Sequence, residues 1–265
     1  MDFATMMQLE PHGTDVFVGV GPRYPWGGLY GGQIVAQALR AAARTVDPEF
    51  RVHSLHAYFI RRGDHDQPIR FEVDRLRNGR SFVTRQVVAR QSMGAIFTMS
   101  ASFQVDEPGH DVQTAQLPDL PGPEQSEGES WSPMFERRFA RPRLQGDGRS
   151  VAWMKMVEPV GHDPILQACA LAYLSDDVAT DAVIAVHPDH AEVADSPDDA
   201  HGFMCASLDH AIWFHRPVVA EEWHLHDFNS HGYLSSRGLA VGHILSQSGV
   251  HVATVTQEVL LRRVG

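Results

Sequence analysis

The sequence predicts an α+β protein built from two similar halves. A helical segment opens each half, at residues 31–46 (GGQIVAQALRAAARTV) and 163–177 (DPILQACALAYLSDD). A run of strand-like segments with turn dipeptides follows each helix. Between the halves, from about 105 to 150, the chain loses its apolar periodicity. One helix followed by an antiparallel sheet, twice over, indicates a tandem α+β duplication.

Both predicted helices carry signals at their start. In the first, apolar residues recur at helical spacing after two glycines: Ile34, Val35, Ala38, Leu39 and Ala42. In the second, Asp163 is placed as an N-cap and Pro164 as the first helical residue, a position where the missing proline N–H is tolerated.

Strands are predicted in both halves by β-branched and aromatic runs between turns. The first half gives segments at 52–63, 69–79, 81–91 and 95–105, and the second at 205–217, 223–232, 238–249 and 250–262. Asn78-Gly79 and Ser248-Gly249 are turn dipeptides that predict hairpins. The segments SLHAYFIRRG and SLDHAIWFHRP resemble each other as counterparts in the two halves.

Composition divides the chain into a first domain at 1–105, a connection at 106–148 and a second domain at 149–265. The connection begins with DEPGHDVQTAQLPDLPGPEQSEGES, which is rich in Pro, Gly and acids and is typical of an extended surface segment. The basic string FERRFARPRL follows it, and we expect that string to pack back as an extended piece.

Charge and hydropathy limit the possible partners. The 265 residues carry a formal net charge of -11, so a nucleic acid is not expected as a partner. No apolar run approaches the ~18 residues of a membrane span, and we expect a cytoplasmic protein. Cys169 and Cys205 lie in apolar surroundings outside any CxxC motif, which favours buried thiols and leaves a disulfide open.

The string SLDHAIWFHRP at 207–217 combines residue types found in hydrolase triads and metal sites. Strand alternation puts Ser207 and Asp209 on one face and His210 on the other, so no local Asp–His pair is expected. The chain has no GxSxG, HExxH or glycine-rich phosphate loop, and HLHD at 224–227 matches a dinuclear metal motif only in part. We therefore expect a packed strand, no metal and no cofactor.

Six strings, in order along nearly the whole chain, resemble the acyl-CoA thioesterase II family of double-hotdog thioesterases. They are YGGQIVAQAL (30–39), HSLHAYFIRRGD (53–64), LRNGRSFVTRQVVARQ (76–91), LAYLSD (171–176), LDHAIWFHRP (208–217) and TQEVLLR (256–262). The resemblance implies a tandem hotdog, in which each half is a long helix wrapped by an antiparallel sheet. It also implies hydrolysis of acyl-CoA to a free acid and CoA.

The same resemblance implies a catalytic set of one acid, one hydroxyl and one glutamine. The matching positions are Asp176, Ser207 and Gln257, with Asp177 as the neighbouring alternative for the acid. The family commonly has threonine at the hydroxyl position. The serine of this chain keeps the hydroxyl donor and acceptor but lacks the methyl group that restrains the rotamer.

Thioester hydrolysis needs a positioned water and a base, and a carboxylate within hydrogen-bond reach can act as that base. We expect Asp176 to take the proton while Ser207 and Gln257 hold the water, without a covalent intermediate. Backbone N–H groups at a helix start would stabilise the oxyanion. Gly31 and Gly32 would allow close approach of the substrate, although the sequence leaves open which helix start contributes.

Two other functions stay open from the sequence. A hotdog enoyl-CoA hydratase would show a D-x-N-P-x-H string, to which HDPILQ at 162–167 is the nearest match. A non-catalytic acyl-CoA binding or sensing module would bind without turnover. Arg61, Arg62 and Arg237 are candidates for holding CoA phosphates or are ordinary surface charges. The sequence sets neither the preferred acyl chain length nor the oligomeric state, and a homo-oligomer is possible.

Overall fold

The structure is a computed structural model that describes residues 1–191 and 202–264. Its helices are α1 (Phe3–Met6), α2 (Gly31–Ala43), α3 (Pro164–Ser175), α4 (Val178–Val186) and the 3-10 helix η1 (Pro123–Gln125). The strands of the first half are β1 (Glu10–Pro11), β2 (Val16–Gly19), β3 (Phe50–Phe59), β4 (Ile69–Asn78), β5 (Phe82–Gln91) and β6 (Gly94–Val105). Those that follow are β7 (Glu127–Gly128), β8 (Phe135–Phe139), β9 (Arg149–Met156), β10 (Phe203–Ser207), β11 (Asp209–Phe214), β12 (His224–Leu234), β13 (Arg237–Ser246) and β14 (His251–Arg263).

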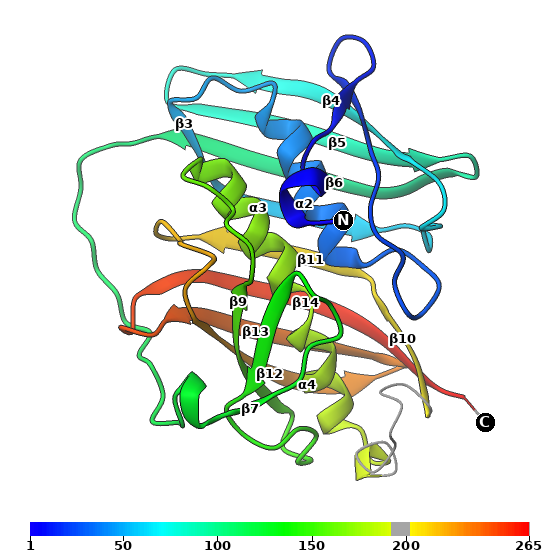
Figure 1. Ribbon diagram of the computed structural model, residues 1–265, viewed down its shortest axis with the longest axis vertical. Coiled ribbons are helices and arrows are strands. Elements are labelled where there is room, and N and C mark those ends of the chain that lie inside the picture. The colour runs from blue at the N-terminus through cyan, green and yellow to red at the C-terminus, as the bar shows by residue number, and fades with distance from the viewer. Residues whose placement is uncertain (192–201, 265) are drawn as a thin grey trace.

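The strands of the described residues form one antiparallel sheet that runs through both halves (Figure 1). Its order is β1-β2-β4-β5-β6-β3-β11-β14-β13-β12-β9-β8-β7, with β10 paired to β14. Followed from each edge toward the centre, the order β2-β4-β5-β6-β3 of the first half corresponds to β9-β12-β13-β14-β11 of the second. The counterpart strands β3 and β11 meet as the central pair, which agrees with an internal duplication.

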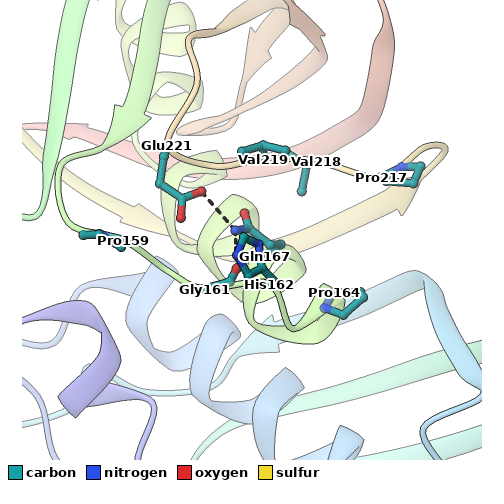
Figure 2. A pocket seen from close by; sticks show the side chains of 9 residues that line it. All are labelled: Pro159, Gly161, His162, Pro164, Gln167, Pro217, Val218, Val219 and Glu221. Atoms are coloured by element: carbon teal, nitrogen blue, oxygen red, sulfur yellow. Dashed lines mark hydrogen bonds between the residues drawn. The ribbon is translucent and has the colours of Figure 1, made fainter.

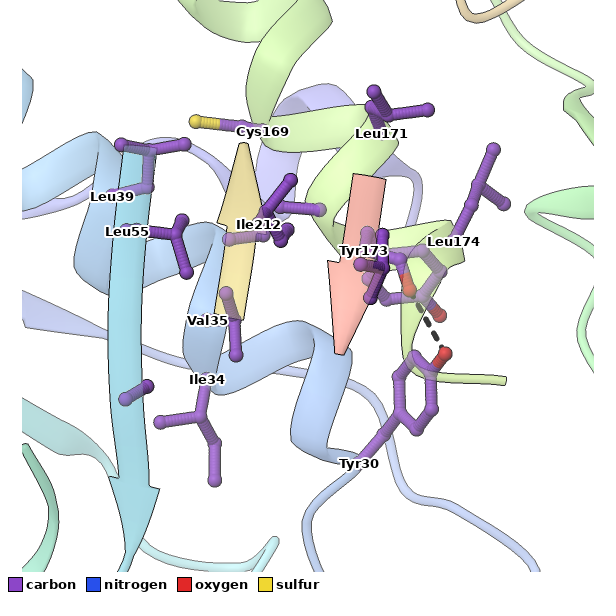
Figure 3. Packing of buried hydrophobic residues seen from close by; sticks show 14 of the residues in the cluster. Tyr30, Ile34, Val35, Leu39, Leu55, Cys169, Leu171, Tyr173, Leu174 and Ile212 are labelled. Carbon is purple, nitrogen blue, oxygen red and sulfur yellow. Dashed lines mark hydrogen bonds between the residues drawn. The ribbon is translucent and has the colours of Figure 1, made fainter. Parts of the chain in front are cut away.

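The helices lie against one face of this sheet, and α2 packs on α3 (Figure 1). Figure 3 shows the core that they share, where Leu39 of α2 and Cys169 of α3 lie over Leu55 of β3 and Ile212 of β11. These four side chains are fully buried. Leu55 and Ile212 are also direct cross-strand partners, so the central strand pair lies directly beneath both helices.

Both predicted helices are confirmed. The Asp163 carboxylate accepts a hydrogen bond from Ile165 N at 3.0 Å and caps α3, and Pro164 is its first residue. Helix α4 was not predicted. Two residues separate it from the end of α3, and apart from Thr180 and Asp181 its sequence is apolar, so it carries only a weak amphipathic signal.

Each predicted strand segment contains a strand, but the alternation expected for 205–217 is wrong. The segment divides into β10 and β11 at Leu208. From Ser207 to Ala211 the chain advances four residues, while their partners on β14, Val259 and Thr256, are three apart. The extra residue is a bulge-like irregularity. It brings Ser207 and His210 to the same side of the sheet rather than to opposite sides.

The connection between the halves contributes to the sheet. Residues 106–122 are irregular, and η1, β7 and β8 follow. The predicted extended piece is confirmed, because FERRF forms β8 and pairs with β9. Leu117 and Leu120 of the connection pack on a separate small cluster formed by Ala140, Val151, Trp153 and Leu225.

Two smaller expectations concern the cysteines and the membrane. Cys169 is buried and Cys205 is half-buried, and both are free thiols. Burial raises the pKa of each thiol to about 12. In the two described ranges of the chain, no helix has the length and apolarity needed to cross a membrane.

The continuous sheet predicts that both halves unfold together. Ile212→Ala should lower the free energy of unfolding by about 2–5 kcal/mol, because it removes a fully buried side chain from the central strand pair. Denaturant unfolding followed by circular dichroism and tryptophan fluorescence should give one shared transition at a lower midpoint. Leu239→Ala, at a half-exposed position on β13, is the control and should change little. Two separate transitions in the Ile212 variant would show that the halves are independent.

Candidate active site

The candidate site lies where the end of α3 meets the start of α2. Asp176 is the C-cap of α3, and its Oδ2 accepts a hydrogen bond from the backbone N–H of Gly32 at 3.0 Å. An acid beyond a helix C-terminus is electrostatically unfavourable by itself. Here the positive end of α2 faces the same carboxylate and offsets that cost. The structure thereby identifies α2 as the helix whose start reaches the acid.

Glycine is required at this junction because the two helices approach so closely. A Cβ atom on Gly32 would lie 2.3 Å from the carbonyl oxygen of Tyr173. A Cβ atom on Gly31 would lie 2.6 Å from Oδ2 of Asp176. Both distances are far below van der Waals contact, so the two glycines let the start of α2 reach the carboxylate.

The other two predicted residues complete a hydrogen-bonded chain with Asp176. Ser207, the last residue of β10, donates its hydroxyl to Asp176 Oδ1 at 3.1 Å. Gln257 on β14 donates its amide Nε2 to Ser207 Oγ at 2.8 Å. Gln257 is fully buried and Asp176 is 6% exposed, whereas Ser207 is half-buried. The structure therefore brings together all five residues singled out from the sequence.

Two further residues extend the chain and were missed. The ring Nδ1 of His210 lies 2.6 Å from Gln257 Oε1, and its Nε2 lies 2.8 Å from Ser175 Oγ. Both His210 and Ser175 are fully buried. The Asp-His pair of the strand was a visible signal. Regular alternation places Asp209 and His210 on opposite faces, which excludes a local Asp–His pair and gives no sign that His210 works with Gln257.

Burial shifts the pKa values of two side chains in this hydrogen-bonded series, Asp176 and His210. It raises the pKa of Asp176 to about 7, although the hydrogen bonds from Ser207 and Gly32 oppose the shift. It lowers the pKa of His210 to about 4, so the imidazole is neutral near pH 7. Removing water from a carboxylate raises its proton affinity, which gives Asp176 the proton affinity that a base needs at neutral pH.

Asp177, the alternative acid, is engaged elsewhere. One carboxylate oxygen accepts from Trp131 Nε1 at 2.6 Å and the other from Arg137 Nη1 at 2.8 Å. The side chains of Asp177 and Arg137 are 7% and 4% exposed, so this is a buried ion pair. The pair fixes the turn between α3 and α4 and leaves Asp176 alone to face Ser207.

Aromatic side chains wall the site on the side of the α2 start. Tyr30, the N-cap residue of α2, donates its hydroxyl to the Tyr173 carbonyl oxygen at 2.8 Å (Figure 3). The Tyr30 ring packs edge-on against Trp131 and Tyr173, with centroids 4.9 and 5.1 Å away. Trp26 lies against Trp131 and is 44% exposed. The aromatic wall thus runs from the buried carboxylate to solvent.

A surface pocket of about 360 Å³ lies elsewhere, at the start of α3 (Figure 2). Pro164 and Gln167 line it together with the loop that carries Glu221. Gln167 Nε2 donates to Glu221 Oε2 at 3.0 Å and to Gly161 O at 2.7 Å, so its amide has a structural role. The pocket is separated from Asp176 by the length of α3, about 18 Å at 1.5 Å per residue.

The remaining sequence candidates have structural partners. Arg61 donates to Ala95 O, Arg62 donates to Trp26 O, and Arg237 donates to Glu258. The HLHD string also does not form a ligand set. Asp227 is bound by Arg149 through two hydrogen bonds of 2.8 Å, and the ring nitrogens of buried His226 have no hydrogen-bond partner among the described residues.

This geometry matches a site for general-base chemistry on a bound water. A carboxylate with a raised pKa, a hydroxyl and an amide converge, and a helix start lies on the opposite side of the carboxylate. In the described part of the chain no histidine is hydrogen-bonded to Ser207 Oγ, and His210 is linked to it only through Gln257.

Comparisons with known proteins identify the family of the chain. Residues 21–104 match the family model described as acyl-CoA thioesterase N-terminal domain, and residues 124–260 match that of acyl-CoA thioesterase. The chain is 34% identical to acyl-CoA thioesterase 2 of Haemophilus influenzae, over 97% of this chain and 96% of the relative. It is 32% identical to human acyl-coenzyme A thioesterase 8, over 97% of this chain and 88% of the relative.

Solved structures give the same result. The chain superimposes on the acyl-CoA thioesterase II TesB2 of Mycobacterium marinum with a TM-score of 0.85 and 35% identity, over 99% of this chain and 98% of that one. A hot dog protein of unknown function from Alicyclobacillus acidocaldarius matches with a TM-score of 0.80 at 20% identity, over 98% and 97% of the two chains, which shows the fold alone. The chain belongs to the acyl-CoA thioesterase family and is a thioester hydrolase.

Proposed function

We propose that this hydrolase cleaves acyl-CoA to a free fatty acid and CoA by attack of a water that Asp176 activates. The proposal rests on the hydrogen bonds to the Asp176 carboxylate, one at each of its two oxygens. One oxygen is bound by Ser207, and through it by Gln257, while the other is bound by the N–H of Gly32. The acid, its two polar partners and a helix start therefore meet at one point.

In the proposed reaction, a water held by Asp176, Ser207 and Gln257 attacks the thioester carbonyl carbon. Asp176 takes one proton from the water as the new C–O bond forms. When the tetrahedral intermediate collapses, the C–S bond breaks and the CoA thiolate leaves. The thiolate is then protonated by Asp176, which returns to the carboxylate form, so protons balance over one turnover.

The start of α2 is the proposed source of oxyanion stabilisation. The backbone N–H groups of Gly31 and Gly32 lie at the positive end of the helix, beside the carboxylate. In the free protein the Gly32 N–H donates to Asp176. We infer that the substrate carbonyl oxygen binds at this helix start as negative charge develops on it.

The contacts favour water over a covalent acyl-enzyme. The Ser207 hydroxyl donates directly to a carboxylate, and the nearest histidine contacts Gln257 rather than Ser207. Serine nucleophiles of hydrolases are commonly paired with a histidine base that a third group orients, and His210 reaches Ser207 only through Gln257. Here the base itself is buried next to the helix start, a placement suited to receiving a proton from water.

The alternative functions have less support. The acid of the hydratase-like string, Asp163, caps α3 and lies 3.3 Å from Nη1 of Arg40. That carboxylate thus has a structural role as a helix cap and does not lie at the start of α2. A non-catalytic binding module would have no need of a buried carboxylate whose pKa is raised to about 7.

We also infer that the fold is a tandem double hotdog, with domains at 1–105 and 149–265 joined by 106–148. The repeated strand order on either side of β3 and β11 supports this inference. Acyl-CoA is the inferred substrate. A cytoplasmic location, the absence of nucleic-acid and membrane partners, and assembly into a homo-oligomer stay predictions.

The base assignment predicts the activity of Asp176→Asn. CoA release from short, medium and long acyl-CoA substrates should fall by at least about 100-fold, because the amide cannot take a proton.

In the wild type, kcat/KM should rise with pH through a midpoint near 7 and then level off, since the deprotonated carboxylate is the active form.

The matched control is Asp163→Asn, which changes a carboxylate on the same helix outside the site and should retain wild-type turnover. Unchanged turnover in Asp176→Asn would move the base to another residue. Wild-type protein that binds these acyl-CoA substrates without releasing CoA from any of them would favour the binding module.

The buried carboxylate also predicts a dependence of stability on pH. Folding raises the pKa of Asp176 from the ordinary 3.8 to about 7. The ionised carboxylate therefore lowers the free energy of unfolding relative to the protonated form. Asp176→Asn should therefore be more stable than the wild type above pH 7, by on the order of 2 kcal/mol. The difference should shrink as pH falls toward 4. Urea unfolding at several pH values measures it, and a constant difference across that range would contradict the raised pKa.

The role proposed for the Ser207 hydroxyl predicts opposite effects of two substitutions on turnover. Ser207→Thr keeps the hydroxyl and should retain turnover within a few-fold, whereas Ser207→Ala should lower kcat by roughly 10- to 100-fold because the water loses one partner. Steady-state kinetics on one acyl-CoA substrate would compare the two. Equal loss in both variants would indicate that packing at this position, rather than the hydroxyl, is what matters.

A further inference from the structure

Resting on the proposed function, we propose that His210 is a positioning residue that sets the orientation of the Gln257 amide and thereby the direction of every hydrogen bond that leads to Asp176. Five side chains form one continuous chain of hydrogen bonds: Ser175, His210, Gln257, Ser207 and Asp176. Four of them are at most 6% exposed, so water cannot replace a lost partner within the chain.

The direction of this chain follows from its charged end. An ionised carboxylate only accepts hydrogen bonds, so the single hydroxyl proton of Ser207 goes to Asp176. The Ser207 oxygen can then only accept from Gln257, which requires the NH₂ group of the amide to face Ser207. The amide oxygen of Gln257 must consequently face His210.

The same reasoning fixes the tautomer of His210. Because Gln257 presents an oxygen 2.6 Å away, Nδ1 must carry a proton. The neutral imidazole has one ring proton, so Nε2 accepts from the Ser175 hydroxyl at 2.8 Å. Ser175 Oγ also lies 3.0 Å from Ala172 O, a second acceptor in the last turn of α3. In the Nδ1–H tautomer, the single hydroxyl proton of Ser175 is thus shared between His210 Nε2 and Ala172 O, and Ser175 ends the chain as a donor.

The orientation matters for the proposed chemistry. The amide nitrogen of Gln257 has two hydrogens: one goes to Ser207, and the amide also acts on the Asp176 carboxylate, whose pKa it helps to lower. A flipped amide would instead present its oxygen to Ser207 and compete with Asp176 for the hydroxyl proton. It would also put an acceptor where water needs a donor. In its Nδ1–H tautomer His210 disfavours this state, because the ring N–H would face an NH₂ group. The flipped amide would require the Nε2–H tautomer, with Ser175 accepting the ring proton and donating to Ala172 O.

The first test is the tautomer itself, measured by ¹⁵N NMR of histidine-labelled wild-type protein at pH 8, where Asp176 is ionised. His210 should show a protonated Nδ1 and an unprotonated Nε2, with its resonance assigned by loss in His210→Asn. The Nε2–H tautomer at this pH would overturn the proposal. This measurement needs no turnover, so its outcome is independent of whether the chain hydrolyses acyl-CoA.

The second test uses two substitutions, each of which replaces only one of the two hydrogen-bonding nitrogens of the imidazole. His210→Asn retains an amide N–H near the Nδ1 position and can still donate to Gln257. His210→Gln carries its amide near the Nε2 position and retains only the contact with Ser175. We expect kcat to fall by roughly 10- to 100-fold in His210→Gln, with KM nearly unchanged, and by several-fold less in His210→Asn.

His226 provides the matched control for loss of a buried imidazole. It is equally buried, and its ring makes no hydrogen bond among the described residues. His226→Asn and His226→Gln should change stability without lowering kcat. Equal losses of kcat in both His210 variants, with melting temperatures shifted as in the His226 pair, would assign His210 a purely structural role. If the His210 variants fail to fold, Ser175→Ala tests the chain from its other end and should raise the population of the Nε2–H tautomer in the same ¹⁵N spectra.

Discussion

The hydrogen bond from Gly32 N–H to the carboxylate of Asp176 is the contact on which the rest of the site depends. It joins the start of a helix in the first half to the end of a helix in the second. Neither half contains a complete site, because the first contributes the helix start and the second contributes the acid, the hydroxyl and the amide. In the proposed mechanism, the packing of α2 on α3 over the central strand pair is therefore a condition for chemistry as well as for stability.

Close packing at this junction also determines the charge state of the acid. Glycine at 31 and 32 brings the helix start against the carboxylate, and the ring of Tyr30 together with Trp131 closes that side of the site. Burial away from bulk solvent raises the pKa of Asp176 to about 7. The positive end of α2 and the Ser207 hydroxyl offset part of that rise, which leaves a group able to accept and release a proton near neutral pH.

Much of the fold could be predicted from local patterns. The N-cap Asp163 with Pro164 marked the start of α3, and alternating residues marked the strands. The irregularity at Leu208 could not be predicted in this way, because a bulge is set by the pairing with β14 rather than by the strand's own sequence. The role of His210 was missed for the same reason.

The site residues show a similar division. The resemblance to a known family indicated Asp176, Ser207 and Gln257, but the sequence alone could not separate Asp176 from Asp177. Two adjacent acids at a helix end have the same local pattern. Arg137 and Trp131 distinguish them, and both come from around residue 130, some 40 positions away in the chain. Contacts of that kind arise only in the folded molecule.

Direct attack by water is the claim that one isotope measurement can test. A single turnover of an acyl-CoA substrate by excess protein in H₂¹⁸O, followed by mass spectrometry of the acid and of the intact protein, would follow the new oxygen. Attack by water held at Asp176 predicts one ¹⁸O in the acid, none in the protein, and no acyl adduct at any quench time. An acyl adduct on Ser207, or ¹⁸O in the carboxylate of Asp176, would show a covalent intermediate and contradict the proposed mechanism.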